Sequence, residues 1–241
     1  MLYRLISVAA IIIVTANVQA QVVHPAKSFF DRGCERLERR DYDGAIADFT
    51  RVIELISRTD GSHDYRRKNW ANQVTPGNDV PGFERVTLID PNMANVYANR
   101  CLARYEKRDL DGAIADCDRA LTISPQLVEA LLNRGNAHYA RRDLDKARAD
   151  YDRALTVNPR YAEAYNNRGN VRRDQGDYLE AIADFDRAIA CNPRSAAAYH
   201  NRGFAHRRIG NGDGALAEFN RAIELNPRLA RAYYGRGVVK N

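Results

Sequence analysis

The chain has 241 residues, and 37 Lys and Arg against 31 Asp and Glu give it a formal net charge of +6 at pH 7. Charged residues make up 28% and apolar residues 45% of the chain, a composition that excludes a disordered polar chain. The positive charge is spread along the sequence without a dense basic run, so we do not expect nucleic acid to be the ligand.

Residues 1–20 have the features of a secretory signal peptide. Arg4 precedes an apolar core, and Val18 and Ala20 supply the small residues that come before a cleavage site. The apolar core is too short for a comfortable membrane span, although an uncleaved anchor is the alternative. We therefore expect the mature chain to begin near Gln21, to be periplasmic or secreted, and not to be inserted in the membrane.

A period of 34 residues governs the rest of the chain. Three columns of identical residues recur with it: Pro91, Pro125, Pro159, Pro193 and Pro227; Ala113, Ala147, Ala181 and Ala215; and Ala120, Ala154, Ala188 and Ala222. Each period holds two stretches with apolar or small residues on one helical face. The second stretch stops before the proline, which cannot continue a helix. The sequence therefore predicts helix pairs, and in residues 128–161 we expect Asp143 to cap the second helix.

This pattern resembles the tetratricopeptide repeat (TPR) family, which has an aromatic residue at position 4, Gly at 8, Ala at 20, an aromatic at 24, Ala at 27 and Pro at 32. Residues 162–195 match with Tyr165, Gly169, Ala181, Phe185, Ala188 and Pro193. The resemblance implies an all-α fold in which helix-turn-helix repeats stack into a right-handed superhelical solenoid. Such a solenoid offers a long binding surface and no chemistry.

The repeats divide the chain into a series of segments. Residues 26–59 form the first repeat, 60–93 a degenerate repeat or loop insertion, and 94–127, 128–161, 162–195 and 196–229 four regular repeats, with a partial repeat or C-terminal helix at 230–241. In 60–93, Arg67 and Asp79 replace the small residues of the helix crossing, so we expect mostly an extended loop with one short helix. The alternative is a binding lobe that uses Tyr65 and Trp70.

The resemblance also implies that six positions in each first helix face a concave groove. The candidate groove residues are Asn99, Asn133, Asn136, Asn167, Asn170, Asn201, Tyr105, Tyr139, Arg173, Arg207 and His200. An amide both donates and accepts hydrogen bonds, so a ladder of asparagines could hold a peptide backbone without reading its sequence. The arginines make one end of the groove cationic, which suits an acidic segment or a C-terminal carboxylate. A solvated polar face without a ligand is the alternative.

An arginine recurs at position 7, where the family more often has leucine. The column consists of Arg32, Arg100, Arg134, Arg168, Arg202 and Arg236. Acidic residues recur in the second helices, at Asp48, Asp116, Asp150, Asp184 and Glu218 and again at Asp118, Asp152 and Asp186. We interpret the two columns as a structural salt-bridge ladder, with direct ligand binding by the arginines as the alternative.

Cysteines and histidines give no sign of catalysis. Cys101 and Cys117 replace the glycine and the aromatic residue that face each other in the other repeats, which predicts a disulfide outside the cytosol; buried free thiols are the alternative. Cys34 and Cys191 have no evident partner. The five histidines lack metal-ligand spacing, and no phosphate-binding loop or nucleophile–base motif is present. We expect no metal, no cofactor and no enzymatic activity.

The sequence therefore predicts a non-enzymatic scaffold that binds an extended peptide or protein segment in its concave groove. The alternative is a structural or assembly subunit, a homodimer formed through an uncapped C-terminal end. Residues 230–241 expose Tyr233, Val238 and Val239 in this interpretation, where a polar capping helix would be expected.

Overall fold

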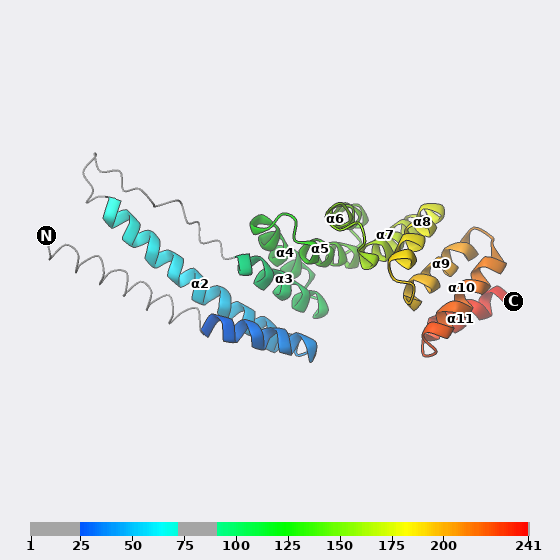
Figure 1. Ribbon diagram of the computed structural model, residues 1–241, viewed down its shortest axis with the longest axis horizontal. Coiled ribbons are helices and arrows are strands. Elements are labelled where there is room, and N and C mark those ends of the chain that lie inside the picture. Colours follow the sequence, from blue (N-terminus) through cyan, green and yellow to red (C-terminus); the bar gives the residue numbers. More distant parts are fainter. Residues whose placement is uncertain (1–24, 72–90, 241) are drawn as a thin grey trace. The chain divides into compact units, whose positions relative to one another are not determined.

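The computed structural model describes residues 25–71 and 91–240, and every regular element in these ranges is an α-helix (Figure 1). The predicted signal peptide, residues 1–20, lies outside the described residues. Within the described ranges, no helix has both the length and the hydropathy that crossing a bilayer requires. The chain divides into two compact units, residues 1–109 and 110–241.

The first unit consists of a helix over residues 25–38, α2 (Tyr42–Ala71) and α3 (Pro91–Glu106). Its hydrophobic core gathers buried residues from all three helices: Ala26, Ala45, Phe49, Val52, Val96 and Ala103. Gly33 lets the first helix approach α2 closely, because a Cβ atom there would lie 2.7 Å from Cε1 of Phe49.

Helix α2 is longer than the sequence predicts. It runs for 30 residues to Ala71, so residues 60–71, which we expected to be mostly loop, continue the helix instead. Ser57 stands where the regular repeats have their proline, and serine keeps the backbone N–H that a helix needs. Tyr65 and Trp70 therefore lie on α2. Residues 72–90, the remainder of the expected loop, are outside the described residues.

The second unit begins with α4 (Leu110–Ile123) and continues with three helix pairs and a last helix. The pairs are α5 (Val128–Ala140) with α6 (Leu144–Val157), α7 (Ala162–Gln175) with α8 (Tyr178–Cys191), and α9 (Ala196–Arg208) with α10 (Gly212–Leu225); the last helix is α11 (Ala230–Lys240). Each helix packs on the next one in the chain, and α5, α7, α9 and α11 also contact one another in succession (Figure 1). The first helices of consecutive repeats thus form one layer.

Glycine lets the two helices of each pair approach closely. A Cβ atom at Gly135 would lie 2.6 Å from Cε1 of Tyr151, and one at Gly169 would lie 2.6 Å from Cε1 of Phe185. Both rings are essentially inaccessible to solvent. The recurring glycine at position 8 is therefore explained by the ring at position 24, which occupies the space of a side chain.

The turn inside each helix pair passes through a residue in the left-handed region. Its φ values are 61° at Arg40, 68° at Arg108 and Arg142, 92° at Gly176 and 82° at Gly210. Glycine adopts this conformation freely, whereas a residue with a Cβ does not. The first three turns therefore carry backbone strain that the last two avoid.

Asp143 occupies the N-cap position of α6, as predicted, but its side chain accepts no capping hydrogen bond. One carboxylate oxygen instead lies 3.6 Å from Nδ1 of His138 and 3.6 Å from Nε of Arg141. The position of the helix start was predicted correctly, and the mechanism of capping was wrong. The nearby basic groups compete for the carboxylate.

The predicted salt-bridge ladder is confirmed in the second unit. Arg134 donates to Asp150 from Nε at 2.9 Å and from Nη2 at 2.5 Å, and to Asp118 from Nη1 at 2.6 Å. Asp118 belongs to the preceding repeat, so a single arginine joins two repeats. Asp150 is only 3% exposed, and its charge is balanced where water cannot reach it.

The same arrangement recurs along the arginine column. Arg168 pairs with Asp184 and Asp152, Arg202 pairs with Glu218 and Asp186, and in the first unit Arg32 pairs with Asp48. Arg100 also donates to Oγ1 of Thr50, and Arg236 donates to Oδ1 of Asn220. The arginine column is part of the structural framework, because its guanidinium groups form hydrogen bonds and ion pairs within the protein.

Candidate functional site

A chain of side-chain amides links the first helices of three consecutive repeats. Asn167 donates to Oδ1 of Asn136 at 2.9 Å, Asn166 donates to Oδ1 of Asn167 at 3.2 Å, and Asn201 donates to Oδ1 of Asn166 at 2.9 Å. Tyr151 adds a hydrogen bond of 2.8 Å to Oδ1 of Asn136 at the start of this amide chain. The asparagines therefore bind to each other between helices α5, α7 and α9.

The amide chain changes how the predicted asparagine ladder is understood. Asn133 and Asn201 are buried, with 8% and 5% of their surface exposed, and Asn167 is half-buried. Part of the hydrogen-bonding capacity at position 6 is thus used inside the protein. Asn99 lies in the first unit, where its amide donates to Sγ of Cys34 at 3.6 Å. Its repeat neighbour Tyr105 lies on α3 of the same unit.

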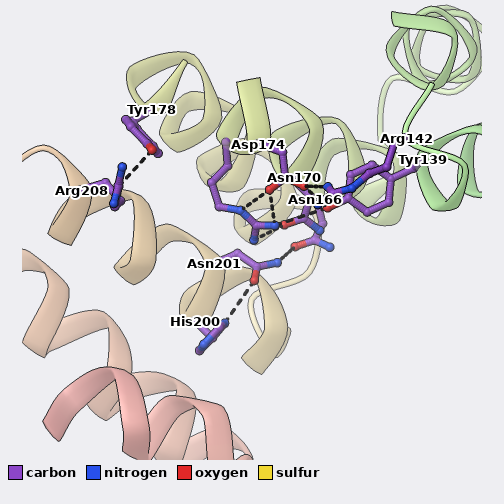
Figure 2. A network of polar contacts seen from close by, with 10 residues as sticks. Tyr139, Arg142, Asn166, Asn170, Asp174, Tyr178, His200, Asn201 and Arg208 are labelled. Atoms are coloured by element: carbon purple, nitrogen blue, oxygen red, sulfur yellow. Dashed lines mark hydrogen bonds and ion pairs between the residues drawn. The ribbon is translucent and has the colours of Figure 1, made fainter. Parts of the chain in front are cut away.

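A second network surrounds Asp174 at the C-terminal end of α7 (Figure 2). Tyr139 donates to Asp174 at 2.7 Å, Arg142 donates to the same oxygen at 3.0 Å, and Arg173 donates to the other oxygen at 2.8 Å. Arg173 also donates to Oδ1 of Asn170 at 2.9 Å. This network brings together three of the predicted groove residues, Tyr139, Asn170 and Arg173, and adds Asp174 and Arg142, which sequence reasoning missed.

The protonation states in this network follow from its contacts. Burial, and then the hydrogen bond to Asp174, raise the pKa of Tyr139 to about 12, so the phenol remains a donor at neutral pH. Burial alone would raise the pKa of Asp174, but the donors Tyr139 and Arg173 hold it below its ordinary value. Asp174 is therefore charged and partly balances two arginines.

Phe204 lies between two arginines of the candidate site. The guanidinium carbon of Arg173 is 5.5 Å from the centre of its ring, and that of Arg207 is 5.2 Å from it. Such contacts fix the planar head of an arginine and leave its edge available for ligands. Sequence reasoning missed Phe204, although it occupies position 9, where the two preceding repeats have Asn136 and Asn170.

His200 stands at the other end of the amide chain. Its Nδ1 lies 3.1 Å from Oδ1 of Asn201 (Figure 2). Its ring packs against Phe219 with 5.7 Å between ring centres. Burial lowers the pKa of His200, the contact with Asn201 opposes this effect, and the charges of Arg231 and Arg173 lower the pKa further. His200 is therefore a neutral group at pH 7.

These contacts join α5, α7 and α9 into one polar surface. We use the term first-helix face for the surface that carries Tyr139, Asn136, Asn166, Asn170, Arg173, His200, Phe204 and Arg207. It contains the predicted residues of the second unit except Asn133, Asn167 and Asn201. Asn167 and Asn201 form hydrogen bonds between the first helices, and Asn133 is buried on α5.

The cysteines fall into two groups. Cys34 and Cys191 are free thiols and are half-buried. Burial raises the pKa of the Cys34 thiol, so it is a weak nucleophile at neutral pH. Cys101 on α3 and Cys117 on α4 are both fully buried, and their disulfide stays a prediction.

No group of three His, Cys, Asp or Glu side chains in the described part of the chain is arranged to hold a metal ion. The titratable residues of the first-helix face are instead engaged with amides, arginines and aromatic rings. This arrangement can bind polar and charged groups by hydrogen bonds and ion pairs.

Two sequence-family models match the chain. One, described as tetratricopeptide repeat, covers residues 132–198, and the other, described as TPR repeat, covers residues 205–240. No curated protein sequence matches the chain significantly. The matched residues include all of α6, α7, α8, α10 and α11 and parts of α5 and α9.

Several solved structures share the fold. The crystal structure of the MamA protein is 21% identical, covers 86% of this chain and 94% of its own, and has a TM-score of 0.59. A tetratricopeptide repeat protein from Parabacteroides merdae ATCC 43184 is 19% identical over 90% of this chain and 72% of its own, with a TM-score of 0.64. YrrB, described as a TPR protein with an unusual peptide-binding site, is 16% identical over 92% of this chain and 97% of its own, with a TM-score of 0.60.

At these identities the structures show the fold alone, and they confirm the predicted all-α solenoid of helix-turn-helix repeats. Proteins of this fold are in general non-enzymatic scaffolds that bind protein or peptide partners. The family models, the shared fold and the glycine–aromatic contacts of the helix pairs agree with one another. Residues 132–198 and 205–240 are thus similar to tetratricopeptide repeats, and the chain shares the fold of the solved repeat structures.

Proposed function

We propose that the chain is a non-enzymatic scaffold that binds an extended segment of a partner protein along the first-helix face. The observation that carries this proposal is the environment of Arg207. Its guanidinium stacks on Phe204, and no carboxylate among the described residues pairs with it. The ladder arginines differ, because Arg134, Arg168 and Arg202 each hold two carboxylates.

The charges of this surface favour an acidic ligand. Arg142 and Arg173 share one carboxylate, that of Asp174, and no described carboxylate pairs with Arg207, which leaves the cluster cationic. A guanidinium pairs with a carboxylate through two parallel hydrogen bonds, and the ring of Phe204 already orients the head of Arg207. An Asp or Glu side chain, or a C-terminal carboxylate, fits this cluster.

The backbone of the ligand would be held by the amides of position 9. Asn136 and Asn170 accept hydrogen bonds at Oδ1 from Asn167 and Arg173, which fixes their orientation. Neither amide NH₂ group has an acceptor among the described residues. Each NH₂ can therefore donate to a peptide carbonyl, which is worth about 1 kcal/mol per bond. Of the predicted asparagines, we therefore assign the backbone contacts to Asn136 and Asn170 at position 9 and no longer to those at position 6.

Fluorescence anisotropy tests this proposal with two labelled ten-residue peptides, one containing several Glu and one with Gln in their place. We expect the acidic peptide to bind the mature chain more tightly, and Arg207→Gln to weaken its binding at least tenfold. Arg160→Gln is the matched control, because it removes the same charge from an exposed turn between repeats. Equal binding of both peptides, or equal effects of the two substitutions, would contradict the proposal.

A second candidate function is that of an assembly subunit that associates through its C-terminal end. Tyr233, Tyr234 and Val238 on α11 are 42%, 77% and 39% exposed, which favours a contact at this end. Sedimentation at several concentrations tests it. A dimer that Tyr233→Lys dissociates would support assembly, and a monomer at all concentrations would contradict a homodimer.

We also propose that the chain acts outside the cytosol, on the basis of the signal peptide predicted at residues 1–20. Intact mass measurement after expression in a bacterial host tests this proposal. Export predicts a periplasmic or secreted chain that begins at Gln21. A full-length chain confined to the cytoplasm would contradict it.

A further inference from the structure

A regular set of exposed arginines lies on the second helices and in the turns that follow them. One arginine stands near the end of each second helix of the second unit, at position 26, and another recurs at position 33, in the turn between repeats. We use the term second-helix arginine array for seven exposed residues, Arg119, Arg153, Arg187 and Arg221 on α4, α6, α8 and α10, and Arg160, Arg194 and Arg228 in the turns. The 34-residue period thus places positive charge at the same end of each second helix.

The turns hold their arginines in one backbone conformation. In each turn, the backbone N–H of the arginine donates to the side-chain oxygen of the asparagine two residues before it. These hydrogen bonds join Arg160 to Asn158 at 3.1 Å, Arg194 to Asn192 at 3.2 Å and Arg228 to Asn226 at 3.1 Å. The three arginines are therefore presented in the same way.

The arginines of the helices adjoin those of the turns. Arg153 donates from Nη2 to the backbone oxygen of Pro125 at 3.3 Å, so position 26 lies beside the turn of the preceding repeat. The equivalent step one repeat later places Arg187 beside the turn that carries Arg160. The two columns therefore form one basic surface.

Most of this positive charge is not neutralised by the protein. Arg153 lies 4.0 Å from Asp150, but both oxygens of that carboxylate accept hydrogen bonds from Arg134. Five members of the array form no ion pair with any residue that the structure describes, namely Arg119, Arg160, Arg187, Arg194 and Arg228. A surface that gathers like charges in this way attracts anions.

Neutral side chains occupy the exposed positions from which an acid would reach an arginine of position 26. An acidic residue four residues before it or three residues after it on a helix would form an ion pair. On α4, α6 and α8 these two positions hold Ala115, Thr122, Ala149, Thr156, Ala183 and Ala190. On α10 the second of them is Glu224, which pairs with Arg221 at 2.9 Å. The exception shows what the other three helices lack.

The chemistry around the array favours a lipid surface as its ligand. A guanidinium pairs with a phosphate through parallel hydrogen bonds, and the headgroups of anionic lipids present many phosphates at once. Val157 is 40% exposed and lies one turn after Arg153, and arginine stems lie along apolar surface while their heads stay with the phosphates. Single-stranded nucleic acid instead stacks its bases on exposed aromatic rings. Tyr161 and Tyr199, which adjoin the array, are half-buried.

We propose that the second-helix arginine array binds the surface of a bilayer that contains anionic phospholipids. The guanidinium groups pair with the lipid phosphates, and Val157 contacts the apolar boundary of the headgroup layer. The contact is peripheral and requires no helix to cross the bilayer. Because the array lies on the second helices and the first-helix face on the first helices, this proposal does not depend on peptide binding.

Cosedimentation of the mature chain with vesicles tests the proposal. One set of vesicles contains phosphatidylcholine alone, and the other is an equal mixture of phosphatidylcholine and phosphatidylglycerol. We expect saturable binding to the mixed vesicles, little binding to the neutral ones, and release as the salt concentration rises. Equal binding to both sets, or no binding to the mixed vesicles, would overturn the proposal.

Two double variants locate the surface, with circular dichroism to confirm an unchanged fold. Arg187→Gln/Arg194→Gln removes two unpaired charges and should weaken binding to the mixed vesicles at least tenfold, since one charge near the surface contributes about fivefold. Arg141→Gln/Arg208→Gln is the matched control, because it removes two exposed charges at the opposite end of the helix pairs. In about 0.1 M salt, where the Debye length is about 10 Å, the control should bind as the unmodified chain does. Equal losses in both variants would show that net charge alone drives binding and would overturn the proposal.

Three further measurements separate this proposal from its competitors. A labelled single-stranded oligonucleotide that binds through Arg187 and Arg194, without binding of the mixed vesicles, would assign the array to nucleic acid and overturn the proposal. A dimer of the unliganded chain that Arg187→Gln/Arg194→Gln dissociates would assign it to a second copy and overturn the proposal as well. Arg160→Gln, the control for peptide binding above, should weaken vesicle binding about fivefold, so the two surfaces are tested independently.

Discussion

Arg168 and Asp184 are joined by two hydrogen bonds, from Nε at 3.0 Å and from Nη2 at 2.6 Å, on helices α7 and α8 of one repeat. The remaining Nη1 of Arg168 reaches Asp152 of the preceding repeat at 2.6 Å. A single guanidinium therefore holds a helix pair together and joins it to its neighbour. This role explains why arginine recurs at position 7.

Replacement of this arginine should destabilise the protein far more than it affects binding. In Arg168→Leu, the buried carboxylate of Asp184 keeps one partner, Arg172 at 2.8 Å, and loses the other. We expect the free energy of unfolding to fall by about 2–3 kcal/mol, less than the roughly 3–5 kcal/mol typical of a broken buried pair. Urea unfolding measures this change.

The double variant Arg168→Leu/Asp184→Leu provides the control for that experiment. It removes both charges, so it should recover part of the lost stability relative to Arg168→Leu. A loss of acidic-peptide binding in Arg168→Leu without a loss of stability would instead assign Arg168 to the ligand.

The amide chain predicts a structural role for the buried asparagines. Asn201→Ala removes the donor to Asn166 and the oxygen that faces His200, and its site is 5% exposed. We expect a loss of about 1–2 kcal/mol in the free energy of unfolding. Asn95→Ala, at an exposed position of α3, should change it by less than about 0.5 kcal/mol. Equal effects of the two substitutions would show that the amide chain contributes nothing to stability.

The left-handed turns predict opposite effects of reciprocal substitutions. Arg40 has a φ of 61° and Gly210 has a φ of 82°, with open space around the Cβ position of Gly210. Arg40→Gly should therefore raise stability, and Gly210→Arg should lower it, each by about 1 kcal/mol. Thermal unfolding monitored by circular dichroism measures both. Changes of the same sign in the two variants would refute the role of backbone strain.

His200 predicts a loss of stability in mild acid. Its pKa in the folded protein is lowered by burial and by the nearby arginines, so the unfolded chain binds more protons below about pH 6.5. The neutral ring therefore contributes stability that is complete above that pH. This contribution declines as the pH falls toward the pKa of His200 in the folded protein.

Urea unfolding at pH 7.5 and at pH 5.5 tests this prediction. His200→Gln should lose less stability between the two pH values than the unmodified protein does. His206→Gln is the control, and it should behave like the unmodified protein. If His200→Gln keeps the full pH dependence, other groups are responsible for it.

The fold was predictable because the same repeat pattern recurs several times in the sequence. The columns of Pro, Ala and Gly, together with the aromatic residues at position 24, define the helix pairs, and the charges at positions 7 and 23 suffice to predict the ladder. The extension of α2 to Ala71 was not predicted, although the absence of proline at Ser57 is visible in the sequence. Polar residues at the helix crossing, with Pro76-Gly77 and Pro81-Gly82 further along, led us to expect a loop. A single long helix does not need a crossing partner for its own hydrogen bonds.

The candidate site was less predictable, because sequence position does not show how side chains share their hydrogen bonds. Asn201 and Asn133 occupy a position expected to face the groove, yet both are buried, and Asn201 donates to Asn166 on the neighbouring first helix. Phe204 was overlooked because an aromatic residue at position 9 interrupts the asparagine column. Its role depends on the two arginines that lie against its ring, and the contact with Arg173 crosses from one repeat to the next.

Hydrogen–deuterium exchange of the mature chain, with and without a bound acidic peptide, tests the central claim most directly. Binding along the first-helix face predicts slower amide exchange in α7 and α9, above all in the last turns that carry Arg173 and Arg207, with α8 and α10 unchanged. Protection confined to α8, α10 or α11 would contradict the claim that the first helices hold the partner.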